Sequence, residues 1–155
     1  MDIPLLWPAA LTLLLFVGAI SDIRDRRLPN WLSLALLLLG LAHAFYLGGL
    51  STTGWHFAHA LIAMVFGAGI FAAGIMGGGD AKFYAGLAAF FPLSEGLSLL
   101  LWVSIAGIIS ILSWMVLRRM LPLKKPEDGS LHAKFPYGVA IAMGGVFVAW
   151  TGLVG

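Results

Sequence analysis

The sequence contains no cysteine, which excludes disulfide bonds, thiolate zinc sites and cysteine nucleophiles. Charge is also scarce, because charged residues make up 10% of the chain, hydrophobic residues make up 61%, and the mean hydropathy is +0.99. Soluble domains carry about 25% charged and roughly 45–50% apolar residues. A chain of 155 residues has too little interior to bury so much apolar surface. The composition therefore predicts an integral membrane protein, and the length fits a single domain over residues 1–155.

Long apolar runs are the most abundant feature of the sequence. A membrane helix needs about 20 mostly apolar residues, and we expect spans over residues 4–21, 31–49, 57–76, 81–92, 95–117 and 136–153. The run 81–92 is short and could be either a span or a re-entrant segment. No basic region precedes the first run, so we expect a retained helix rather than a cleaved signal peptide. The expected fold class is all-α, a polytopic membrane protein with about six transmembrane helices.

Basic residues gather in groups that indicate the membrane face. They lie within residues 24–27, at Lys82 and within residues 118–134, and such groups usually mark the cytoplasmic side. We therefore expect no nucleic-acid partner, although the net charge is +2. If the first and last groups both face the cytoplasm, an even number of crossings separates them, which requires 81–92 to span and leaves both termini outside. We expect residues 118–134 to form a flexible cytoplasmic loop.

Only seven acidic residues are available for chemistry. The expected topology assigns four of them to the outer side or to the flexible loop, namely Asp2, Glu95, Glu127 and Asp128. The other three, Asp22, Asp25 and Asp80, lie at cytoplasmic ends of spans, where acidic side chains are functional candidates. Arginines crowd Asp25 and favour its ionised form, which suits a structural or topogenic role. Two neighbouring carboxylates cannot both ionise easily, so Asp22 and Asp80 could together activate water and protonate a leaving group.

The residues around Asp80 are further candidates. Gly77, Gly78 and Gly79 precede it and permit backbone angles and close approaches that a Cβ forbids, with a flexible turn as the alternative. Lys82 could lower the cost of a charged Asp80 or orient a substrate carbonyl. An interfacial lysine with no role in chemistry is an equally good interpretation.

The outer side of the expected fold carries a polar turn and histidines. We expect Gly48-Gly49 and residues 51–54 to form the turn between the second and third spans. His56 and His59 are three residues apart and can share a helix face, with His43 nearby. No acid or cysteine lies near them in the sequence, so we expect no metal and no cofactor.

Three segments, taken in order, resemble the prepilin-peptidase family. Residues 22–30 (DIRDRRLPN) resemble the family pattern of an aspartate, six residues, then proline and Asn or Asp. Residues 77–83 (GGGDAKF) resemble the GxGD motif, which is often followed by a lysine two residues on. Residues 135–141 (FPYGVAI) are similar to the start of the last span in short members. The resemblance covers nearly the whole chain.

The resemblance implies that Asp22 and Asp80 are the catalytic carboxylates of an aspartyl endopeptidase. It favours Asp22 over Asp25, since only Asp22 has the required offset to Pro29. The residues that would border the substrate are Gly77, Gly78, Gly79, Lys82, Pro29 and Asn30. Asn30 could also cap the second span.

The implied substrate is a type IV prepilin, with a short basic leader before a hydrophobic helix and a cut just after a glycine. The implied location is a bacterial or archaeal cytoplasmic membrane, with the active site on the cytoplasmic side. The lipid bilayer and the pilus-assembly machinery are the other expected partners, and the oligomeric state is not specified.

The chain departs from the long, bifunctional members of this family. It lacks their cysteine-bearing cytoplasmic domain, so N-methyl transfer and zinc are not expected, and it is more similar to short, peptidase-only members associated with Tad/Flp-type pili. Presenilin-like proteases usually have Tyr before the first aspartate, whereas Ser21 precedes Asp22 here. The alternatives are a small proton- or ion-coupled transporter and a non-catalytic scaffold of a secretion system. Transporters tend to show midplane acids and internal repeats, and neither is visible in this sequence.

Overall fold

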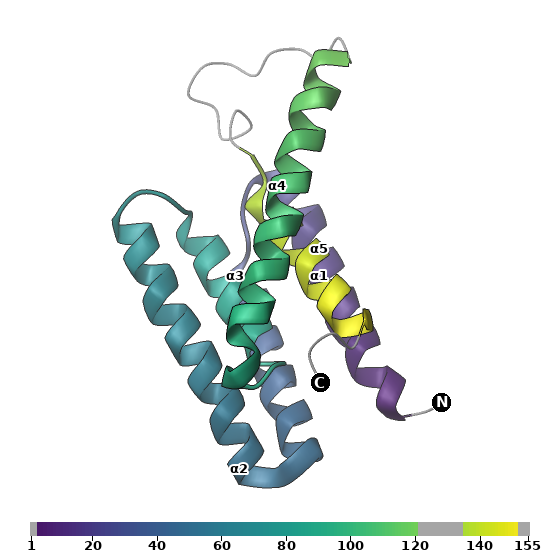
Figure 1. Cartoon of the computed structure of the whole chain (residues 1–155), viewed down its shortest axis with the longest axis vertical. Helices are drawn as coiled ribbons and strands as arrows, with labels where there is room; N and C mark the ends of the chain where they lie inside the picture. Colours follow the sequence, from purple (N-terminus) through teal and green to yellow (C-terminus); the bar gives the residue numbers. More distant parts are fainter. Residues whose placement is uncertain (1–2, 121–134, 152–155) are drawn as a thin grey trace.

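The computed structural model describes residues 3–120 and 135–151, which are helical with short connections and contain no strand (Figure 1). The helices are α1 (Ile3–Asp25), α2 (Asn30–Ala72), α3 (Gly78–Ala88), the short 3-10 helix η1 (Leu93–Glu95), α4 (Gly96–Met120) and α5 (Tyr137–Thr151). The all-α prediction is confirmed for these ranges. Within them, three helices are long and apolar enough to cross a membrane, over Leu5–Asp25, Asn30–Ala72 and Leu93–Leu117. Most of the expected loop 118–134 lies outside the described residues.

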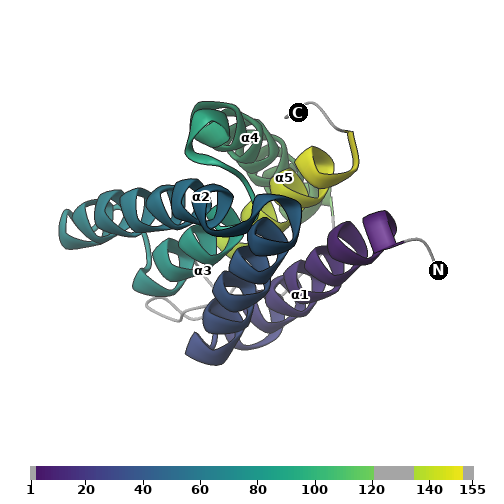
Figure 2. The ribbon, with the colours of Figure 1, turned by 90° about the horizontal axis from the view of Figure 1, so that it is seen from below.

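Helix α2 is bent back on itself at Gly48 and Gly49, which have non-helical backbone angles. Gly49 has a φ of 65°, a left-handed conformation that glycine adopts without a steric penalty. The bend divides α2 into a first limb, residues 30–47, and a second limb, residues 50–72, that run in roughly opposite directions (Figures 1 and 2). The expected polar turn is therefore shorter than predicted, because residues 51–54 are helical. Polar side chains are accommodated in this helix, where the Thr53 hydroxyl donates to the Gly49 carbonyl at 2.9 Å.

Helix α3 is shorter than the expected fourth span. It has 11 residues, which at 1.5 Å per residue gives about 16 Å, against about 30 Å for the hydrocarbon core of a bilayer. The run 81–92 therefore does not form one continuous spanning helix. After Ala88 the chain turns and continues through η1 into α4. Pro92, which has no backbone N–H to donate, lies in this turn.

Two buried histidines hold the chain that follows α3. His56 Nδ1 hydrogen-bonds to the Ala89 carbonyl and His59 Nδ1 to the Phe91 carbonyl, both at 2.9 Å. Carbonyl groups at the end of a helix lack partners within the helix, so these two bonds satisfy groups that burial would otherwise penalise. In the described ranges, no group of three His, Cys, Asp or Glu side chains is placed to hold a metal ion. The histidines thus have a structural explanation.

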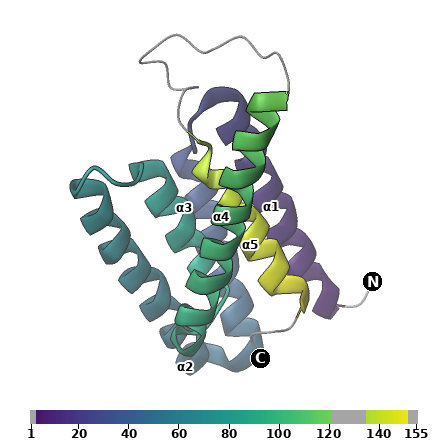
Figure 3. The same cartoon turned by 45° about the horizontal axis from the view of Figure 1, so that its top comes forward.

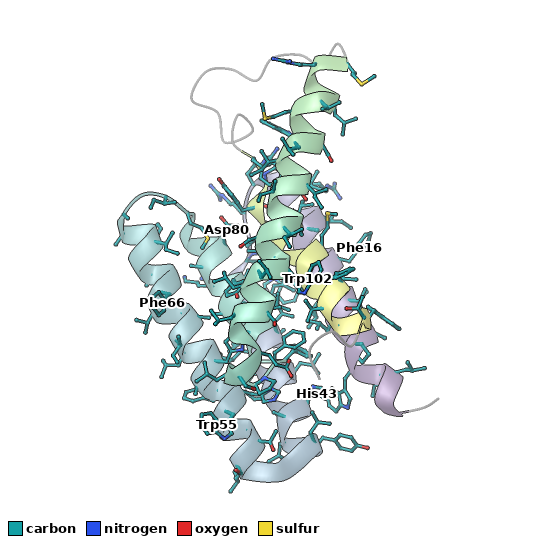
Figure 4. All side chains as sticks on the ribbon, viewed as in Figure 1. Phe16, His43, Trp55, Phe66, Asp80 and Trp102 are labelled. Atoms are coloured by element: carbon teal, nitrogen blue, oxygen red, sulfur yellow. The ribbon has the colours of Figure 1, made fainter. Side chains whose placement is uncertain are left out.

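The core lies where α1, α2, α3, α4 and α5 meet (Figure 3). Its largest fully buried side chains are Phe83, Leu11, Leu15, Leu32, Leu36, Leu87, Leu99 and Val148. Large apolar side chains also cover the outside, among them Phe16 at 62% exposed and Phe66 at 70% exposed. An apolar surface this extensive is what lipid covers in a membrane protein. Asp80 lies toward one end of the molecule, and His43 and Trp55 lie toward the other (Figure 4).

Candidate active site

Asp22 lies in the last turn of α1, whereas the sequence placed it just after a span. Its side chain is only 7% exposed, and its Oδ2 accepts a hydrogen bond of 2.7 Å from the Gly138 backbone N–H. Gly138 is in the first turn of α5, where backbone N–H groups have no partner within the helix. The N-terminus of a helix also favours a carboxylate electrostatically. The start of α5 therefore holds one oxygen of Asp22 in a defined orientation.

Asp80 lies in the first turn of α3 and is half-buried. Burial raises the pKa of Asp80 to about 6, the nearby charge of Asp22 acts in the same direction, and a hydrogen bond with the Gly77 backbone opposes both. The influence of Asp22 follows from the fold, which brings the end of α1 and the start of α3 together. The structure thus places two carboxyl groups, 58 positions apart in the sequence, close enough to affect each other's protonation.

Both carboxyl groups line one open cavity of about 470 Å³. Its lining residues are Asp22, Arg26, Arg27, Leu28, Pro29, Asn30, Gly77, Gly79, Asp80 and Lys82. Every residue that the sequence singled out for the site is among them except Gly78, which lies beside the ring of Phe71. Asp25 is exposed and does not line the cavity. The cavity can hold a peptide segment against the two carboxyl groups.

The two segments that form the cavity are joined by a side-chain hydrogen bond. Lys82 Nζ donates to Asn30 Oδ1 at 3.1 Å, which connects α3 to the start of α2. The expectation that Asn30 caps α2 is wrong, because Pro29 occupies the capping position and no side chain bonds to the free N–H groups there. Asn30 is already the first helical residue, and its side-chain oxygen is used by Lys82 instead.

The three glycines before Asp80 supply space rather than backbone freedom. Gly77 has an ordinary φ of −71°, and Gly78 and Gly79 belong to α3, so the expectation of unusual backbone angles is wrong. A Cβ on Gly77 would lie 2.7 Å from Asp80 Oδ2, which is too close. A Cβ on Gly79 would meet only Leu28, at an ordinary 3.4 Å. The expected close approach is therefore found at Gly77.

Two cavity features were missed by reading the sequence. The sequence indicated only a topological role for Arg26, yet this residue lines the cavity. Its Nε and Nη1 are buried and have no hydrogen-bond partner among the described residues. Helical spacing from Asp22 gave no usable signal, because α1 ends at Asp25 and Arg26 has a φ of 52°. The contact between Gly138 and Asp22 had no comparable signal, because 116 residues separate the two.

Comparison with known proteins identifies the family of the chain. A family model described as type IV leader peptidase family matches residues 9–112, a range that contains both aspartates. A stretch of 79 residues is 29% identical to the prepilin peptidase EppA of Methanocaldococcus jannaschii, covering 51% of this chain but only 22% of that relative's length. No solved structure matches the chain. Because the family model matches well over half of the sequence, the chain belongs to the type IV leader peptidase family.

Proposed function

We propose that the protein is a membrane-embedded aspartyl endopeptidase that removes the leader peptide of type IV prepilins, of the Tad/Flp kind. The observation that carries this proposal is the meeting of Asp22 and Asp80 in one cavity. The family supports a protease that acts on a leader peptide. A transporter or a non-catalytic scaffold has no such support.

In the proposed mechanism the two carboxyl groups share one proton. Asp80, with its raised pKa of about 6, holds this proton. Asp22 is ionised, accepts a proton from a water molecule, and the water attacks the scissile carbonyl carbon. The proton of Asp80 then passes to the leaving amine as the C–N bond breaks, and the proton taken by Asp22 restores the singly protonated pair. The positive charge of Arg26, which lines the cavity, favours the negative charge that develops on the carbonyl oxygen.

We further propose that the chain crosses the membrane about six times, with the cavity at the cytoplasmic face. The two limbs of α2 are roughly 27 Å and 34 Å long at 1.5 Å per residue, so each approaches the thickness of a bilayer. The end of α1, the start of α3 and the end of α4 lie toward the same end of the molecule (Figure 1). This arrangement supports the even number of crossings expected between the basic groups. Helix α3 would enter the membrane only part of the way and continue through residues 89–95.

Single-cysteine labelling tests this topology, because the chain has no cysteine of its own. We expect Asp25→Cys to react with a membrane-impermeant maleimide only in inverted vesicles, and Leu50→Cys, at the bend of α2, only in intact spheroplasts. Leu50 is 81% exposed, so access is limited by the membrane and not by the fold. Phe16→Cys, in the middle of α1, is the control and should react in neither preparation. Labelling of positions 25 and 50 from one side would contradict the proposed crossing count.

The pKa of Asp80 predicts the pH dependence of cleavage. Asp80 is protonated below a pH of about 6 and ionised above it, so the singly protonated pair is lost as the pH rises through about 6. We therefore expect kcat/KM for a precursor peptide to fall over this range. Bound substrate excludes water and raises the carboxyl pKa further, so the fall in kcat should occur at higher pH. A kcat/KM that stays level above a pH of about 6 would show that Asp80 does not supply the proton.

The glycines before Asp80 provide a matched pair of variants. Gly77→Ala places a methyl group against the Asp80 carboxyl group, and we expect cleavage to fall by about tenfold as that group is displaced. Gly79→Ala makes only an ordinary contact with Leu28 and leaves the Asp80 carboxyl group in place, so any loss of cleavage should be smaller than for Gly77→Ala. Cleavage would be measured on precursor gels at matched expression, with thermal aggregation in detergent as the stability control. Equal activity of the two variants would show that space at Gly77 is not needed.

A further inference from the structure

A second cavity, of about 310 Å³, adjoins the first. The two cavities share Asn30 and Lys82 as lining residues, so they adjoin at the hydrogen bond between these side chains. The remaining lining residues of the second cavity are Ser33, Leu34, Leu37, Phe57, Ala60, Leu61, Met64, Ala85 and Gly86. We call it the apolar groove, because all its lining residues except Asn30, Lys82 and Ser33 are apolar.

Three helical segments, the two limbs of α2 and helix α3, each present one regular face to the apolar groove. The first limb of α2 contributes Asn30, Ser33, Leu34 and Leu37, and the second limb contributes Phe57, Ala60, Leu61 and Met64. Both sets have the spacing i, i+3, i+4, i+7, which is a single face of a helix over two turns, or about 10 Å. Helix α3 contributes Lys82, Ala85 and Gly86 in the same register. Such a pattern is typical of a groove that receives the apolar face of another helix.

The shape of the apolar groove also suits a helix. Its walls are the large side chains, of which Leu34, Phe57 and Leu61 are 53%, 49% and 52% exposed and have no covering residue in the described structure. Its floor is formed by the small residues Ala60, Ala85 and Gly86, all of which are buried. In a membrane, helices associate through close packing over small residues rather than through the hydrophobic effect.

The end of the apolar groove that adjoins the first cavity carries an unused polar group. Ser33 is 8% exposed, and its Oγ has no hydrogen-bond partner among residues 3–120 and 135–151. An unsatisfied buried hydroxyl is costly, and its oxygen can accept a hydrogen bond. Ser33 and the neighbouring Asn30 and Lys82 make this the polar end of the groove. A polar end suits the N-terminus of a bound helix, where backbone N–H groups have no partner within the helix.

We propose that the apolar groove binds the first two turns of the hydrophobic helix that follows the scissile bond of the precursor, with the start of that helix at Ser33. The inference rests on the proposed function, since it names the part of the substrate that the groove receives. The choice of this occupant rests on the position of the apolar groove, which adjoins the cavity of the two carboxyl groups at Asn30 and Lys82. A helix in the groove directs the residues just before it past Asn30 and Lys82, toward the two carboxyl groups.

Disulfide cross-linking tests the inference without requiring cleavage. Leu61→Cys or Leu34→Cys, in an Asp80→Asn background and reconstituted in lipid, would be mixed with a precursor that carries one cysteine a single turn beyond the cut site. We expect oxidation with copper phenanthroline to give a cross-linked band with both variants. Phe66→Cys is the matched control, because Phe66 is 70% exposed on the outer side of the same limb (Figure 4). Equal cross-linking of positions 61 and 66, or none at 61 and 34, would overturn the proposal.

A variant of the groove floor tests it kinetically in the active protein. Ala60→Leu fills the groove, and we expect kcat/KM for the full precursor to fall by about tenfold, a change of about 1.4 kcal/mol in binding. A short peptide that ends soon after the cut should be cleaved as well by this variant as by the unmodified protein. Ala58→Leu, which does not line the groove, is the control. Failure to cleave either substrate with the unmodified protein would refute the proposed function, whereas equal losses on both substrates would refute only the groove.

Discussion

Asp22→Asn and Asp80→Asn are each expected to lower the rate of precursor cleavage by about 10²–10⁴-fold, the usual contribution of a general acid or base. An amide keeps the shape of the carboxyl group but cannot exchange the proton that the mechanism requires. The fold should survive, because in Asp22→Asn the amide oxygen of the new side chain can still accept the hydrogen bond from Gly138. The measurement is the initial rate of leader removal with the purified variants in lipid.

Asp25→Asn is the control for this prediction. Asp25 is three residues from Asp22 on the same helix end, but it is exposed and lies outside the cavity. We expect this variant to retain most of its activity. Substantial cleavage by Asp22→Asn or Asp80→Asn would remove that residue from the mechanism, and an inactive Asp25→Asn would show that the wrong aspartate of the segment has been assigned.

Gly138→Ala is expected to lower cleavage by about 10²-fold, the effect of displacing a catalytic group by about 1 Å. A Cβ at this position would lie 2.9 Å from Asp22 Oδ2 and 3.1 Å from Asp22 Cβ. The side chain of Asp22 would have to rotate, and the hydrogen bond from the Gly138 N–H would be lost or distorted. The rate would be measured as for the aspartate variants, together with the melting midpoint.

Gly107→Ala is the matched control for Gly138→Ala. Its Cβ would meet only Ala140 of the neighbouring helix, at an ordinary 3.7 Å, so we expect normal cleavage. Normal cleavage by Gly138→Ala with an unchanged melting midpoint would mean that the contact between α5 and Asp22 is not needed. This test is informative because Gly138 lies beyond residues 9–112, to which the family match extends.

The sequence predicted the class of protein correctly, and the site residues that it indicated, except Gly78, line one cavity, while their roles stay predictions. Mean hydropathy and the scarcity of charge required a membrane protein, and the described residues are all-helical with apolar helices. The order of Asp22, Pro29-Asn30 and the glycines before Asp80 indicated the residues that line the cavity. These inferences depend on local composition and spacing, which the sequence displays directly.

Other predictions failed because they depended on local backbone geometry. The bend at Gly49 is sharper than the expected polar turn, since one residue with positive φ is enough to reverse the helix direction. Residues 81–92 are apolar enough for a span, but their helix ends at Ala88, where His56 and His59 bind the carbonyl groups that follow. Hydropathy measures the average environment of a segment and not the position at which its helix ends.

Composition and hydropathy by themselves determined that this chain is a helical membrane protein, and its two aspartates Asp22 and Asp80 lie in segments that resemble prepilin-peptidase motifs. Only the tertiary structure decided which groups surround those aspartates and where the apolar groove lies. Contacts between α1, α2, α3 and α5 bring the Gly138 N–H and Arg26 to the carboxyl groups and form the apolar groove. Such contacts join residues far apart in the chain, and they depend on helix packing and on the direction of each side chain. Neither the packing of the helices nor the direction of a side chain can be read from the sequence alone.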